Sequence, residues 1–159
     1  MKYLFAFIVL ISFKVLANHT KIDNDLINLM SNNKSTEIGI NYIKQHEYDK
    51  AINFFLLEVD KKNMDGSVNL GLIYEYLKND YIKAEKYYNL SAFSNNAYGQ
   101  YNLGILHYIV KKEKNEGYKW ISCSANQGYL LAIEARSYLL NNNMIEKKDA
   151  ALIEKDLDC

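Results

Sequence analysis

The chain has 159 residues, 49% of them hydrophobic, which suits one domain or one short repeat array and argues against wholesale disorder. It has 7 glycines and no proline, so collagen-like, proline-rich and low-complexity classes are excluded. The 19 basic residues balance 19 acidic ones, and Arg136 is the one arginine, so we expect no binding to nucleic acid.

Residues 1–17 have the layout of a secretory signal peptide. An apolar run at 4–13 follows a basic start, and 15–17 offers small or branched residues before a cut ahead of Asn18. The alternative is a membrane anchor, but the run is too short for a hydrocarbon core of about 30 Å and Lys14 interrupts it. We therefore predict a periplasmic or secreted protein without a stable membrane span after cleavage.

Residues 18–35 are predicted to form an N-terminal helix, over 21–30, and a polar linker, over 31–35, with Ser35 as a possible N-cap. The helix is indicated by apolar residues at helical spacing. These are Ile22, Leu26, Leu29 and Met30.

From residue 36 to residue 140 the sequence resembles itself at an offset of 33. Several columns keep the same residue type, and they include Gly66 and Gly99, Asn69 and Asn102, Leu70 and Leu103, Gly71 and Gly104, and Ala51 and Ala84. Apolar residues in each half-unit recur every three or four positions, and short polar breaks separate the halves. Asp80 and Asn115 can cap the helices that follow such breaks. Each unit is therefore predicted to be a helix hairpin.

Gly71 and Gly104 are expected inside helices, where glycine costs about 1 kcal/mol relative to alanine. A repeated glycine in such a position needs a physical reason. We expect the paired helix to approach closely and to pack an aromatic ring against the bare backbone.

The pattern Leu70-Gly71-x-x-Tyr74, followed by Lys83-Ala84-x-x-Tyr87-Tyr88-x-x-Ser91-Ala92, resembles the Sel-one-like repeat, a close relative of the tetratricopeptide repeat. The resemblance covers 36–140, with three to four units, the last one partial. It implies an all-α fold, an α-solenoid of stacked antiparallel helix hairpins.

The chain departs from the family pattern at three places. The glycine-rich turn between helices is replaced by 78–80 and by 112–114, Gly117 stands where alanine is expected, and Arg136-Ser137 replaces Leu-Gly. After these units, 141–159 is predicted to contain a C-terminal capping helix, because a thin apolar stripe runs through the charged segment from Glu146 to Leu157.

The two cysteines leave two arrangements open. In an oxidising compartment Cys123 and Cys159 can form a disulfide. Alternatively, Cys123 is a small buried helix residue and Cys159 is a free residue at the C-terminus.

The sequence contains no CxxC, HExxH, GxSxG or GxxxxGK[ST] motif. His107 falls in the column of Tyr74, which favours a packed histidine over a general base. We predict no catalytic residue, no metal site and no cofactor.

A partner-binding groove follows from the resemblance, since tetratricopeptide hairpins line their inner groove with first-helix residues near the glycine and the tyrosine. The corresponding residues are Ile43, Leu72, Tyr76, Tyr98, Tyr101, Ile105, Tyr108 and Tyr138. Four of the 14 tyrosines of the chain occupy core columns. The tyrosines of the predicted groove are different ones, and their rings suit a contact surface. The alternative is that they pack between neighbouring hairpins.

The resemblance implies an exported protein–protein interaction module or scaffold that binds a protein or peptide, and small exported members include toxin-neutralising immunity proteins. One alternative is a secreted enzyme that binds or weakly hydrolyses β-lactams, but the relatives of that type carry a disulfide in every repeat. Another alternative is a peptidoglycan-associated assembly factor of the cell envelope.

Overall fold

The computed structural model describes residues 19–30 and 34–159, and in these ranges all regular structure is helical. The predicted signal peptide and most of the predicted linker lie outside the described residues. The helices are α2 (His19–Leu29), α3 (Lys34–Lys44), α4 (Tyr48–Asp60), α5 (Met64–Tyr76), α6 (Tyr81–Ala92), α7 (Ala97–Ile105), the π-helix η1 (Leu106–Lys111), α8 (Lys114–Asn126), α9 (Leu130–Asn141) and α10 (Lys147–Lys155). The prediction of an all-α fold is confirmed.

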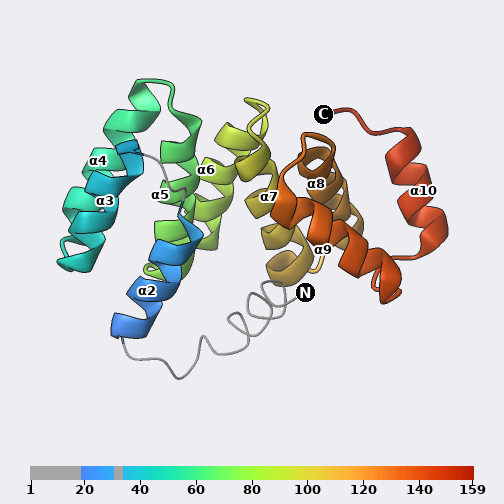
Figure 1. Cartoon of the computed structure of the whole chain (residues 1–159), viewed down its shortest axis with the longest axis horizontal. Coiled ribbons are helices and arrows are strands. Elements are labelled where there is room, and N and C mark those ends of the chain that lie inside the picture. Colours follow the sequence, from blue (N-terminus) through green and yellow to red (C-terminus); the bar gives the residue numbers. More distant parts are fainter. Residues whose placement is uncertain (1–18, 31–33) are drawn as a thin grey trace.

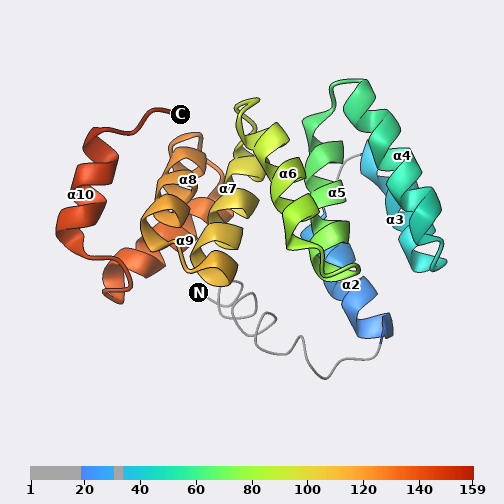
Figure 2. The ribbon, with the colours of Figure 1, turned by 180° about the vertical axis from the view of Figure 1, so that it is seen from behind.

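The helices from α3 to α9 form a row in which each helix packs against the next one in the chain (Figure 1). Helix α7 also contacts α5, and α10 returns to pack against α8. Helix α2 is not part of the row, because it packs on both α3 and α5. Seen from the two opposite sides, α2 and α6 lie on opposite faces of α5 (Figures 1 and 2).

The spacing of 33 residues recurs in the positions where helices begin. Helices α4, α6, α8 and α10 begin at positions 48, 81, 114 and 147, and α5, α7 and α9 begin at 64, 97 and 130. The predicted capping helix α10 therefore stands at the period of the units before it. It ends at Lys155, two residues before the predicted end at Leu157.

The turns between helices keep the same spacing, although most of them lack glycine. A left-handed backbone occurs at His46, Asn79 and Lys112 after one set of helices, and at Lys62, Asn95 and Gly128 after the other. Such a residue closes the last turn of a helix, as where the backbone nitrogen of Asn96 donates to the carbonyl oxygen of Ser91. At Asn79 and Asn95 the residue type favours this conformation, because asparagine adopts it more readily than most residues.

Three side chains cap the helices that follow these turns. Those of Asn63, Asp80 and Asn96 accept hydrogen bonds from the first backbone N–H groups of α5, α6 and α7. Asp80 therefore caps as predicted. The predictions for Asn115 and Ser35 are wrong, because both residues lie inside helices that begin one residue earlier.

The glycines inside helices mark close approaches, as expected. A Cβ atom on Gly71 would collide with the ring of Tyr88, and one on Gly39 would collide with the ring of Phe55. The third position differs from the prediction, because Gly104 faces the aliphatic side chain of Ile121 and no aromatic ring.

The π-helix η1 explains why glycine replaces alanine at position 117. The wider turn places the backbone of Tyr108 against α8, and a Cβ on Gly117 would lie 2.7 Å from the Tyr108 nitrogen. Alanine fits the equivalent position of the preceding unit, where Ala84 is fully buried on α6.

Apolar side chains are buried in two clusters. The first joins α2 to the helices from α3 to α8, with Leu26, Phe55 and Tyr88 among its members. The second joins α7 and η1 to α8, α9 and α10 and includes Tyr101 and Tyr118. Within the described ranges, no helix is both long and apolar enough to cross a membrane.

Candidate functional site

Helix α2 covers part of the face where the groove was predicted. The side chains of Leu26, on α2, and of Met30, directly after it, are 0% and 5% exposed, and they belong to the same buried cluster as Ile43 and Leu72. Ile43 and Leu72 are themselves only 0% and 1% exposed. These two predicted groove residues are therefore not accessible to a partner in this structure, which corrects that part of the prediction.

Tyr76, a third predicted groove residue, also lies close to α2. Burial raises the pKa of its hydroxyl well above the usual value, and the negative charges of Glu75 and of Asp25, a residue of α2, add to the shift. The tyrosine is therefore neutral at physiological pH, and it belongs to the buried cluster beside α2.

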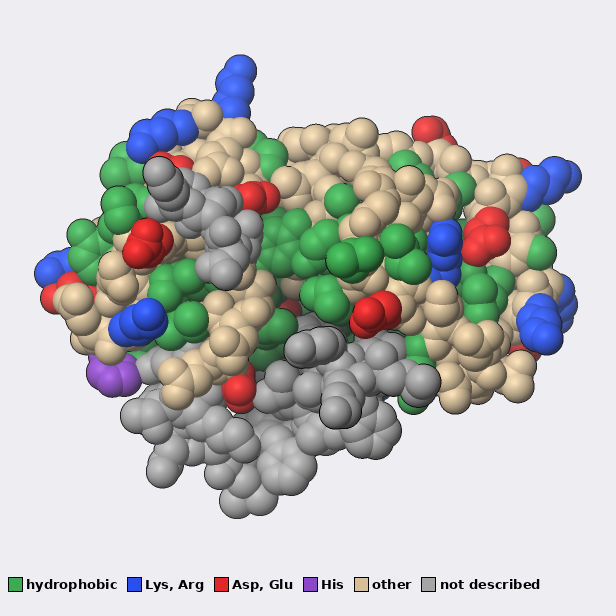
Figure 3. All heavy atoms as spheres, in the orientation of Figure 1, with side chains coloured by type: hydrophobic (Ala, Val, Ile, Leu, Met, Phe, Trp, Pro, Cys, Tyr) green, Lys and Arg blue, Asp and Glu red, His purple; other side chains and the backbone are tan. Residues whose placement is uncertain are grey.

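A pocket of about 270 Å³ lies at the C-terminal end of α2. Residues of α2, of α7, and of α9 with the turn before it line this pocket, namely Asn28, Leu29, Met30, Tyr98, Tyr101, Asn102, Tyr129 and Leu131. In the space-filling view, hydrophobic side chains gather in the middle of this face of the molecule, between α2 and α9 (Figure 3).

Three tyrosine rings form one wall of the pocket. The ring of Tyr129 lies 5.4 Å from that of Tyr101 and 6.0 Å from that of Tyr98, between ring centroids. Burial raises the pKa of Tyr129 to about 12, and Asp65 adds to the shift. Tyr101 is nearly buried, and burial raises its pKa as well. The wall is therefore uncharged, apolar on its rings and polar at its hydroxyl groups.

Two hydrogen bonds organise the polar side of the pocket. The hydroxyl of Tyr98 donates to the backbone carbonyl oxygen of Leu29, which ties α7 to the last turn of α2. The side-chain amide of Asn102 donates to the backbone carbonyl oxygen of Tyr98 at 2.8 Å. The first bond therefore joins two sides of the pocket, and the second lies within α7.

The eight predicted groove residues are thus divided among different environments. Tyr98 and Tyr101 line the pocket, whereas Ile43, Leu72 and Tyr76 belong to the first buried cluster. The remaining residues pack in or against the second cluster, and these are Ile105, Tyr108 and Tyr138.

Tyr108 does not face the pocket, because its hydroxyl donates to the backbone carbonyl oxygen of Met144 at 2.8 Å, in the segment between α9 and α10. Tyr108 is buried there, so it is not accessible to a partner in this structure. Tyr108 belongs to the π-helix η1, which the periodicity of the sequence did not indicate.

Six of the pocket residues were not predicted. Asn28 and Leu29 are on α2 and Met30 directly follows it, and the others are Asn102, Tyr129 and Leu131. Two signals were available in the sequence: Asn102 repeats Asn69, and Leu131 stands 33 residues after Tyr98. The contribution of α2 carries no such signal, because α2 is not in register with the units.

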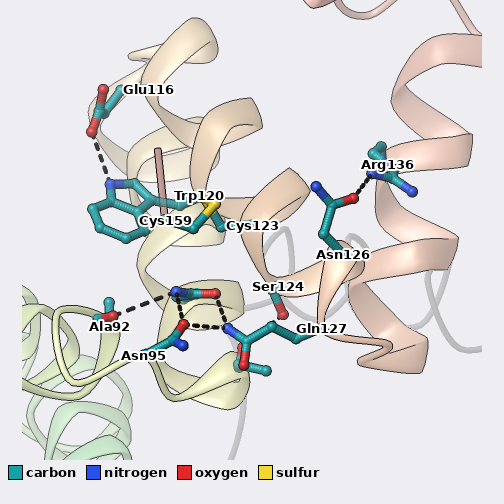
Figure 4. Close-up of a disulfide and its surroundings, with 12 residues drawn as sticks. Ala92, Asn95, Glu116, Trp120, Cys123, Ser124, Asn126, Gln127, Arg136 and Cys159 are labelled. Atoms are coloured by element: carbon teal, nitrogen blue, oxygen red, sulfur yellow. Dashed lines mark hydrogen bonds between the residues drawn. A yellow bond between two sulfur atoms is a disulfide. The ribbon is translucent and has the colours of Figure 1, made fainter. Parts of the chain in front are cut away.

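The structure joins Cys123 and Cys159 in a disulfide, so it has the first of the two arrangements that the sequence left open (Figure 4). The bond holds the C-terminus against α8. On the same helix, the indole nitrogen of Trp120 donates to Glu116 at 2.8 Å. A further hydrogen bond from Tyr118 to Glu154 ties α10 to α8.

His107 is buried in a small cluster of charged groups. Its Nδ1 atom lies 2.6 Å from a carboxylate oxygen of Glu113, and its Nε2 atom lies 3.4 Å from Glu85. The hydrogen bond to His107 lowers the pKa of Glu113, and Lys111 lowers it further. In the described part of the chain, no group of histidine, cysteine, aspartate or glutamate residues is arranged to hold a metal ion.

Comparisons of this chain with family models, with curated proteins and with solved structures gave no significant match.

Proposed function

We propose that this chain is an exported interaction module of the Sel-one-like type, an α-solenoid of helix hairpins, and that it binds another protein at the tyrosine pocket beside α2. The observation that carries the proposal is the wall of three tyrosines, Tyr98, Tyr101 and Tyr129, that meets apolar residues of α2 and α9. Tyrosine is enriched among the residues that dominate binding energy at protein interfaces.

The pocket is small. Its volume of about 270 Å³ lies at the lower edge of the range of roughly 300–1,000 Å³ that is usual for small-molecule sites. It suits one or two inserted side chains, with the rest of the contact spread over the surrounding surface. A toxin that is neutralised by binding is one form such a partner can take, and an envelope component is another.

The pocket can be tested with a photoreactive phenylalanine analogue introduced in place of Leu131, which lines the pocket on α9. The matched control carries the same analogue in place of Ile82, which is 84% exposed on α6. After irradiation of cells that express the protein, we expect a specific adduct from position 131 and none from position 82. Adding Tyr129→Ala should reduce the adduct. No adduct from position 131, or the same adduct from both positions, would refute the proposed site.

Export is tested separately by determining the N-terminus of the protein recovered from periplasm or medium. The proposal expects a chain that begins at Asn18. A full-length chain that stays in the cytoplasm would contradict the export part of the proposal and leave the pocket unaffected.

A further inference from the structure

The described contacts of α2 with the rest of the chain include apolar packing and one hydrogen bond. Leu26 and Met30 enter the first buried cluster, and Leu29 accepts the hydrogen bond from the Tyr98 hydroxyl. Asn24 and Asn28, on the other side of the helix, are exposed. α2 is 11 residues long, and an isolated helix of this length is marginal in water. Its helical conformation therefore depends on the surface on which it lies.

The surface beneath α2 contains a polar group that α2 does not satisfy. Asn69 of α5 is 0% exposed, and within the described part of the chain neither its amide nitrogen nor its amide oxygen has a hydrogen-bond partner. A buried amide without partners is unfavourable, so native proteins rarely leave one.

The register of α5 places Asn69 on the side where α2 lies. Gly71 faces α6, and Asn69 is two residues earlier, or about 200° around the helix. Tyr76, whose hydroxyl is affected by the charge of Asp25 on α2, comes seven residues after Asn69. The two side chains therefore lie on the same face of α5, away from α6 and toward α2. One unit later, the equivalent Asn102 lines the pocket and donates a hydrogen bond.

We propose that α2 is an internal occupant of the partner site, and that the partner presents an amphipathic helix that replaces α2 and supplies a polar group to Asn69. This inference rests on the proposed function. Leu26 and Met30 show the apolar spacing that the surface accepts. Replacing α2 removes Asn28, Leu29 and Met30 from the pocket lining. The lining from α7 and α9, which includes the tyrosine wall, stays in place to contact the partner helix.

The inference can be tested with the full chain and a fluorescein-labelled peptide of residues 19–30. In the wild type, the tethered α2 competes at a high effective concentration and excludes the peptide. Leu26→Asp places a charge in the buried cluster and releases the tethered helix, so we expect the peptide to bind this variant at least tenfold more tightly than it binds the wild type. The control is Asn24→Asp, which adds the same charge on the exposed side of α2 and should behave as the wild type does.

The role of Asn69 is tested by placing glutamine in turn at each apolar position of the peptide. We expect one glutamine peptide to bind the Leu26→Asp protein more tightly than the parent peptide does. That gain should disappear in the protein that also carries Asn69→Leu. If no glutamine peptide shows a gain that depends on Asn69, the part of the inference that concerns the polar group is refuted.

A measurement on the wild type keeps the inference testable if Leu26→Asp does not fold. In native-state hydrogen exchange, the amides of α2 should exchange through an opening that leaves α5 and α7 protected. If α2 exchanges only with global unfolding, or if the peptide binds wild type and a folded Leu26→Asp protein equally, the inference is overturned. Adducts from position 131 would still support the proposed function in that case, so the two failures are distinguishable.

Discussion

The disulfide between Cys123 and Cys159 should contribute a large part of the stability of the C-terminal third of the chain. The two residues are 36 positions apart, so the bond closes a loop that contains α9 and α10. On the chain-entropy estimate, closing a loop of this length stabilises the folded state by about 3–4 kcal/mol. Cys159→Ser is a suitable perturbation, because Cys159 is exposed whereas Cys123 is fully buried on α8.

We expect Cys159→Ser to lower the free energy of unfolding by about 3–4 kcal/mol, measured by urea denaturation under oxidising conditions. Reduced wild-type protein should match the variant, and adding reductant to the variant should change nothing. The hydrogen bond from Tyr118 to Glu154 remains available in the variant, so the folded state need not change. A loss below about 1 kcal/mol, with a wild type that still contains no free thiol, would refute the assignment of stability to the cross-link.

Three further predictions follow from close contacts and burial. Gly117→Ala should lower the free energy of unfolding by about 1–3 kcal/mol, because the new Cβ would lie 2.7 Å from a backbone nitrogen of η1. Gly128→Ala is the comparison variant, since its Cβ would meet no atom within 4 Å and its only strain is the φ of 85°. Asn69→Leu should raise the free energy of unfolding by about 1 kcal/mol, because it removes a buried amide without partners. In an alkaline titration followed by tyrosinate absorbance, Tyr129 should ionise at a higher pH than an ordinary tyrosine, since burial raises its pKa to about 12.

The sign of the Tyr129 effect follows from linkage. The folded-state pKa lies above the ordinary tyrosine value of 10.0, so the stabilising contribution is fully present below pH 10.0 and is lost as the pH rises toward about 12. Unfolding by urea should therefore become easier over this range, and Tyr129→Phe should reduce that pH dependence. A phenol at position 129 that titrates near pH 10.0 in the folded protein would contradict the burial described here.

The sequence by itself determined the helical units and their spacing. Gly39, Gly71 and Gly104 stand in one repeating column because each lies where the second helix of its unit approaches closely, against Phe55, Tyr88 and Ile121 respectively. A close approach that recurs in each unit gives a periodic sequence pattern. The helices could be predicted from local sequence, because residues three or four positions apart lie on the same face of a helix and the apolar residues recur at that spacing.

Only the tertiary structure decided which of the predicted groove residues are buried and which line a pocket. Helix α2 lies outside the period, and Tyr98 bonds to Leu29 across a separation of 69 residues, so no repeated column records the contact. The disulfide between Cys123 and Cys159 and the π-helix η1 at Tyr108 also occur once each in the described chain and repeat in no other unit. Such contacts depend on which surfaces remain unpaired after the units have packed. For that reason Ile43 and Leu72, which the pattern placed on an open groove, are buried in the cluster that Leu26 of the N-terminal helix also enters.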